Sequence, residues 1–139
     1  MRLVTEPDFY NGGEDEVRLL NSLIRRLHEH LTIHDSGVWL VASGVHSRMH
    51  LTLQKFCGEH LVDNVTLKAC KDDVLKLREV SKGDQGQPWF EFSLFVKLYD
   101  EPEIDYRWGQ NPQVTPVDLV FDLVRFPRHE ATLPEWYLS

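Results

Sequence analysis

The sequence predicts an α+β fold: a four-stranded antiparallel sheet made of two hairpins, with helices packed on one face. Three observations support this class. Helical spacing and strand alternation follow one another in the order helix, two strands, helix, two strands, short helix. The strands of each pair are close enough in sequence to form a hairpin. A chain of 139 residues, 42% of them hydrophobic, is near the commonest size of one domain, so we expect residues 1–139 to share a single core.

The first half of the chain predicts one helix and one hairpin. Residues 14–31 place apolar side chains at helical spacing after an acidic first turn, which indicates an amphipathic helix. The apolar run 38–42 is bounded by Gly37 and Gly44 and predicts a buried strand. Residues 49–56 alternate between apolar and polar side chains, so we expect them to form its partner strand.

The second half repeats this helix-plus-hairpin pattern in loose form. Residues 64–81 predict a second helix, and the segment 82–88, with two glycines and a proline, predicts a loop. Residues 90–98 alternate regularly and give the clearest strand in the chain. The turn residues 100–102 separate it from residues 104–108, which we expect to complete the second hairpin.

The last part of the chain predicts a short helix and an apolar tail. Thr115 has the character of an N-cap, and Pro116 suits the first helical position. Apolar residues between 117 and 124 continue at helical spacing, and Pro127 ends the helix. The tail 133–138 is apolar, and we expect it to pack back on the domain.

The formal net charge of −7 is concentrated near the two ends of the chain. Residues 1–16 carry five acidic residues against one arginine, and residues 99–139 carry eight against three arginines. A negative field disfavours direct binding to nucleic acid and favours a basic partner protein. The alternative is that the acidic balance serves only to keep the protein in solution.

Cysteine usage and hydropathy predict a cytoplasmic protein without a membrane partner. The first eight residues lack the apolar core of a signal peptide, and no stretch approaches the roughly 18 apolar residues of a membrane span. Cys57 and Cys70 lie apart and lack the spacing of a metal site, so we expect reduced thiols.

Two pairs of histidines offer the clearest candidates for chemistry. His30 and His34 stand four residues apart near the end of the first helix, and His46 and His50 repeat that spacing across a turn. The metalloprotease order H-E-x-x-H is absent, and neither pair has a predictable third ligand or orienting acid. We therefore expect no catalytic residue, metal or cofactor, with a histidine-dependent or metal-dependent hydrolase as the alternative.

Acidic and aromatic residues gather around the second hairpin turn. Acidic groups can steer a cationic protein toward a surface, and exposed aromatic side chains can anchor it. The acids do not follow the spacing of a calcium loop. A solvated turn with its aromatic residues in the core is the plain alternative. The predicted partner-binding residues are Tyr99, Asp100, Glu101, Glu103, Asp105, Tyr106 and Trp108.

Short motifs in the second half resemble the YezG-like immunity proteins. They are Pro-Trp-Phe-Glu-Phe at 88–92, Ile-Asp-Tyr at 104–106, Phe-Pro-Arg at 126–128 and Leu-Pro-Glu-Trp at 133–136. The preceding helices fit the same layout, but the region 44–68 departs from it. The resemblance implies an acidic cytoplasmic antitoxin that binds and neutralises a secreted polymorphic toxin, often a basic nuclease domain.

A non-enzymatic module that dimerises through its sheet edge or its tail is a further hypothesis.

Overall fold

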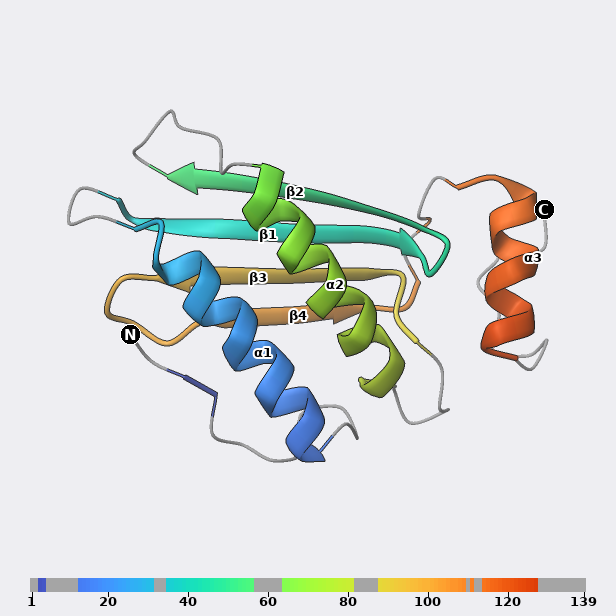
Figure 1. The fold of residues 1–139 in the computed structure, drawn as a ribbon, viewed down its shortest axis with the longest axis horizontal. Helices are drawn as coiled ribbons and strands as arrows, with labels where there is room; N and C mark the ends of the chain where they lie inside the picture. The colour runs from blue at the N-terminus through green and yellow to red at the C-terminus, as the bar shows by residue number, and fades with distance from the viewer. Residues whose placement is uncertain are drawn as a thin grey trace.

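The computed structural model describes residues 3–4, 13–31, 35–56, 64–81, 88–109, 111 and 114–127. The predicted tail 133–138 lies outside these ranges. The element order matches the prediction, and the α+β class is confirmed (Figure 1). The elements are α1 (Gly13–His28), β1 (Gly37–Val45), β2 (Arg48–Phe56), α2 (Asn64–Val80), β3 (Glu91–Lys97), β4 (Glu103–Arg107) and α3 (Pro116–Arg125).

The four strands form one antiparallel sheet in the order β2-β1-β3-β4. The strands β1 and β2 form one hairpin, and β3 and β4 form the other, as predicted. The inner strands β1 and β3 join the hairpins, with a register that runs from Gly37 opposite Lys97 to Ser43 opposite Glu91. No helix in the described ranges is long and apolar enough to cross a membrane.

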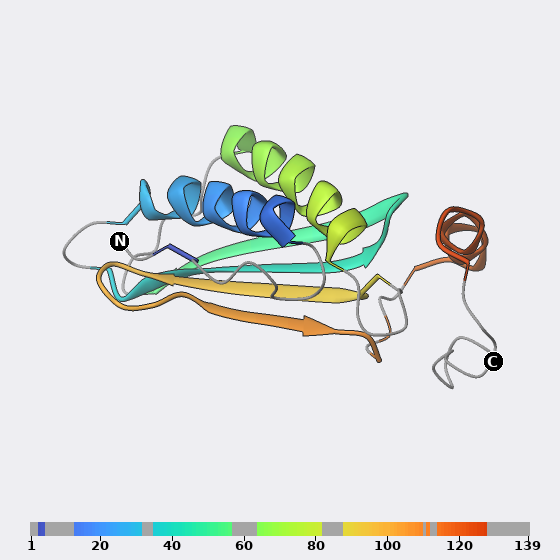
Figure 2. The same ribbon diagram turned by 90° about the horizontal axis from the view of Figure 1, so that it is seen from below.

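The helices α1 and α2 cover one face of this sheet (Figure 2). Each presents an apolar stripe to the strands, and the inward-facing residues of the strands complete the core. The indole of Trp89, just before β3, is fully buried and donates to Ser81 Oγ at 2.9 Å. The fully buried side chains of the core include Leu20, Leu23, Ile24, Leu27, Leu40, Leu77, Trp89, Phe92 and Leu94.

Helix α1 lies against the second hairpin, β3–β4, and helix α2 lies against the first hairpin, β1–β2. The α1 residue His28 places Nε2 3.0 Å from the carbonyl oxygen of Leu98, just after β3. Another α1 residue, Glu16, accepts a hydrogen bond from the Tyr106 hydroxyl of β4 at 3.3 Å. The helix α2 instead contacts β2 and runs antiparallel to α1 (Figure 1). The two helix-plus-hairpin units are therefore interlocked.

The third helix differs from the prediction that the helices pack on one face. It lies across the end of the sheet, beside the turn between β1 and β2 (Figures 1 and 2). Its start is as predicted, because the Asp118 N–H donates to Thr115 Oγ1 and Pro116 occupies the first turn. The polar side of α3 faces the protein: Asp118 accepts hydrogen bonds from Ser47 Oγ and Arg48 Nε, both at 3.0 Å.

A buried ion pair fastens α3 to α2. Arg78 Nη1 lies 2.5 Å from Asp122 Oδ1, Nη2 lies 3.0 Å from Oδ2, and both side chains are inaccessible to solvent. The Arg78 Nε donates to the carbonyl oxygen of Trp89 at 2.7 Å, and the backbone N–H of His46 donates to Asp122 Oδ1 at 3.0 Å. The guanidinium also lies 5.3 Å from the ring centroid of Phe126. These partners compensate for much of the water that both charges lose on burial.

Candidate protein-binding face of the sheet

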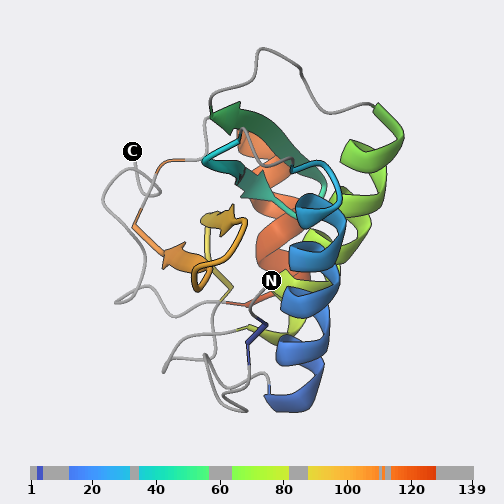
Figure 3. The same cartoon turned by 90° about the vertical axis from the view of Figure 1, so that its left-hand side faces the viewer.

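The sheet face opposite α1 and α2 carries no helix among the described residues (Figures 2 and 3). Alternation along each strand directs every second side chain onto this surface, which we call the open face. Its residues are Trp39, Val41 and Ser43 on β1, His50, Thr52 and Gln54 on β2, Glu91, Ser93, Phe95 and Lys97 on β3, and Glu103, Asp105 and Arg107 on β4.

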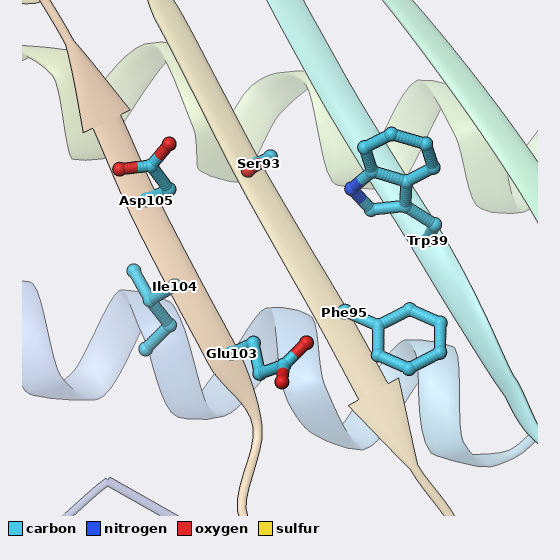
Figure 4. A pocket seen from close by; sticks show the side chains of 6 residues that line it. All are labelled: Trp39, Ser93, Phe95, Glu103, Ile104 and Asp105. Carbon is cyan, nitrogen blue, oxygen red and sulfur yellow. The ribbon is translucent and has the colours of Figure 1, made fainter.

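Two aromatic side chains occupy the middle of the open face. The strand register places Trp39 opposite Phe95, and Phe95 opposite Glu103. The Trp39 side chain is 40% exposed, which is unusual for the largest side chain on a central strand. A shallow hollow of about 370 Å³ lies here, lined by Trp39, Ser93, Phe95, Glu103, Ile104 and Asp105 (Figure 4). Aromatic groups thus form one side of the hollow, and carboxylates of β4 form the other.

The charged groups around the hollow are acidic in balance. On β3 and β4, the open face carries the acidic residues Glu91, Glu103 and Asp105 and the basic residues Lys97 and Arg107. Lys97 Nζ lies 3.3 Å from Glu103 Oε1, and Arg107 Nε donates to Asp105 Oδ2 at 2.9 Å, a hydrogen bond that raises the pKa of Arg107. These pairs lie in water, where they are weak and can exchange partners. The open face can therefore offer its carboxylates to an incoming cation.

Five of the predicted partner-binding residues lie at the surface. Glu103 and Asp105 belong to the open face and line the hollow. Tyr99, Asp100 and Glu101 are exposed in the turn between β3 and β4, where the side chain of Tyr99 is 72% exposed. The acidic turn and the open-face residues of β4 follow one another directly along the chain.

The other two predicted residues belong to the core side of the sheet. Tyr106 is 4% exposed, and its ring centroid lies 5.3 Å from that of Phe92. Trp108 is partly buried and packs against Tyr106 at 6.2 Å between ring centroids. Because side chains alternate along β4, the exposure of Asp105 requires its neighbour Tyr106 to face the helices. These two aromatic residues are therefore removed from the candidate surface.

Trp39 and Phe95 take their place, and both were missed as binding residues in the sequence. Phe95 alternates with the core residues of its strand, which already placed it with the polar residues Glu91, Ser93 and Lys97. Trp39 is less apparent, because it lies within a wholly apolar run that predicted a buried strand. The two residues come together only when β1 pairs with β3.

The histidines have separate surroundings. His30 Nε2 lies 3.1 Å from Thr66 Oγ1, His50 is exposed on β2, and His34 lies outside the described residues. His46 lies beside α3, with Nε2 3.4 Å from Glu79 Oε1 and with Nδ1 buried and without a hydrogen-bond partner in the described structure. Among all the residues that the structure describes, no group of three or more His, Cys, Asp or Glu side chains could hold a metal ion.

Comparison with models of known protein families gives no match, and comparison with curated proteins gives no significant match either. The candidate surface therefore rests on the geometry and chemistry of this chain.

Proposed function

We propose that this protein binds a basic partner protein through the open face of its sheet. The observation that carries the proposal is the pairing of two partly exposed aromatic side chains, Trp39 and Phe95, with the carboxylates of Glu103 and Asp105. They lie on a sheet face that no helix covers in the described part of the chain. Partly exposed aromatic groups supply the anchoring area of protein interfaces, and surrounding charges set the rate and selectivity of encounter.

We further propose that the partner is a secreted toxin domain, such as a basic nuclease, and that binding neutralises it in the cytoplasm. The support is the resemblance of the 88–136 motifs to YezG-like immunity proteins together with the net charge of −7. A nuclease domain carries basic groups for nucleic-acid phosphates, so an acidic surface is complementary to the cleft that it must block.

Identification of the partner is the first test. The tagged protein is expressed in its native host, purified at low salt, and analysed by mass spectrometry together with a metal analysis of the same sample. A basic protein bound at fixed stoichiometry supports the proposal. Recovery of the protein without a partner but with a full equivalent of metal would instead favour the hydrolase alternative, and attention would move to the histidines.

The binding face is then tested with the identified partner by charge reversal. Glu103→Lys with Asp105→Lys should weaken binding about 10-fold to 100-fold at low salt, mainly through slower association. A matched control, Asp15→Lys with Asp72→Lys, reverses two exposed charges on the helices that cover the other face. Equal weakening by both double variants would refute the open face as the site and leave only a general charge effect.

The aromatic part of the face is tested by Trp39→Ala. Removal of a central anchoring side chain should weaken binding at least about 10-fold, mainly through faster dissociation. Tyr99→Ala, in the turn between β3 and β4, reports whether the exposed turn contributes as well. Unchanged affinity of the Trp39 variant would remove the hollow from the interface.

A further inference from the structure

The third helix turns its apolar side to solvent. Four side chains of α3 are 59 to 77% exposed although they are large and hydrophobic. Their spacing of three, one and three residues places them along one side of the helix. These four residues, which we call the α3 stripe, are Val117, Val120, Phe121 and Val124.

The buried polar contacts hold α3 in this orientation. A peripheral helix normally buries its apolar stripe and exposes its charged side. Here Asp118 and Asp122 occupy the inner side, where Asp122 pairs with the fully buried Arg78. Rotation of the helix to bury the stripe would leave that buried guanidinium without its carboxylate, which is strongly destabilising. The stripe is thus an exposed surface that the rest of the structure maintains.

We propose that the α3 stripe is a self-association surface on which a second copy of this chain docks, with the two α3 helices antiparallel about a twofold axis. The spacing of the stripe reads the same in both directions. Antiparallel pairing therefore places Val117 opposite Val124 of the other copy, and Val120 opposite Phe121. A twofold interface requires such a self-complementary patch.

A hollow beside the stripe gives the second copy a place for its phenyl ring. It has a volume of about 240 Å³ and lies between α3 and the β1–β2 turn. A cavity of about 150 Å³ with apolar walls is enough to bind benzene, so this space can accept the ring of Phe121 from the other copy. The residues that line it are His46, Ser47, Phe121, Asp122, Val124 and Arg125.

The lack of charge on the stripe argues against a basic protein as the occupant and is compatible with the equally uncharged stripe of a second copy. The stripe carries no charged residue, because Asp118 and Asp122 face inward and Arg125 pairs with Glu79 at the side of the helix. Two chains of net charge −7 repel each other where their acidic surfaces meet. Contact through α3 brings apolar surfaces together without bringing those acids into the interface.

The size of the stripe indicates a weak dimer. A helix of 10 residues is about 15 Å long, and four side chains from each copy fall short of the roughly 1,200 Å² buried in stable complexes. We therefore expect a dissociation constant in the range of about 1 μM to about 1 mM. The dimer uses a surface distinct from the open face, so it can form with or without the partner of the proposed function.

The test is sedimentation equilibrium of the full chain from about 1 μM to about 1 mM, a range that spans the expected constant. The average mass should rise toward that of a dimer. Val124→Asp should weaken the dimer at least about tenfold, and Phe121→Ala, which adds no charge, should weaken it as well. Tyr99→Asp is the matched control, because it adds the same charge at a site with similar exposure and should leave the dimer intact.

Disulfide formation tests the antiparallel arrangement. In a Cys57→Ser background, a mixture of Val117→Cys and Val124→Cys chains should cross-link on oxidation faster than either chain alone. In the single variants, identical positions lie about 10 Å apart along the helix axis, beyond the reach of a disulfide. A chain that stays monomeric at the highest concentration overturns the proposal. So does a dimer that Val124→Asp leaves intact, or one in which the single variants cross-link best.

Discussion

Replacement of Asp122 by alanine should release α3 from the rest of the protein. The side chain of Arg78 is fully buried, and Asp122 supplies two of its hydrogen bonds in addition to the opposite charge. The carbonyl of Trp89 remains after the substitution, but it cannot balance the charge. The guanidinium must then stay buried without a counter-ion or become hydrated by displacing α3.

The expected loss of stability is about 3 to 5 kcal/mol, the usual cost of removing one partner of a buried ion pair. Domains of this size are stable by about 5 to 15 kcal/mol, so the variant should be folded but close to marginal. With a urea dependence of about 2 kcal/mol per molar, the unfolding midpoint should fall by about 1.5 to 2.5 M. Tryptophan fluorescence can follow the transition, because Trp89 is buried beside Arg78.

Two controls separate the buried charge from the loss of a contact. Arg78→Met with Asp122→Leu removes both charges and should recover most of the stability lost in the single variant. Asp118→Ala changes the same residue type one turn earlier, where its partner Arg48 is largely exposed, and should shift the midpoint much less. The reasoning is refuted if Asp122→Ala costs under about 1 kcal/mol, or if the double variant is no more stable than the single variant.

Three further predictions concern other residues of the described structure. Burial, aided by the charges of Arg125 and Arg78, lowers the pKa of His46 in the folded protein. The unfolded chain therefore binds a proton there more readily, and the free energy of unfolding should fall as the pH drops below about 6.5. His46→Gln should flatten this pH dependence in thermal melts. Gly44→Ala should lower the free energy of unfolding in urea by about 1 to 3 kcal/mol, because φ is +144° and the new Cβ would lie 2.1 Å from the carbonyl oxygen of Arg48. Gly109→Ala is the control and should be nearly neutral, because a Cβ at that position meets open space. Burial raises the pKa of Cys70 to about 11, so iodoacetamide at pH 8 should leave this thiol unmodified in the native protein and alkylate it after unfolding.

The helices and strands could be predicted from the sequence because their signals are local. Alternation at 90–98 corresponds to the observed β3, and Thr115 with Pro116 begins α3 as expected. The pairing of β1 with β3 joins distant segments, and no local pattern specifies it. The orientation of α3 depends on Arg78, 44 residues before Asp122, whereas its valines have the same spacing as in a helix that faces the core.

The candidate surface could be predicted only in part, for the same reason. Clustering of acids located the second hairpin, and Glu103 and Asp105 do lie on the open face. Sequence clustering could not tell which aromatic residues share their face, because adjacent residues of a strand point in opposite directions. Tyr106 is thus buried, and Trp39 reaches the acids from a strand that lies more than 60 residues earlier in the chain.

The interlocking of the two helix-plus-hairpin units bears on how the chain folds. Since α1 lies over β3 and β4, and α2 lies against β2, neither unit can complete a hydrophobic core alone. The two units must meet before either is stable, which makes folding depend on contacts between distant parts of the chain and slows it. We therefore expect the sheet and its two helices to unfold in one cooperative transition, and we expect fragments divided between β2 and α2 to acquire structure only when they are mixed.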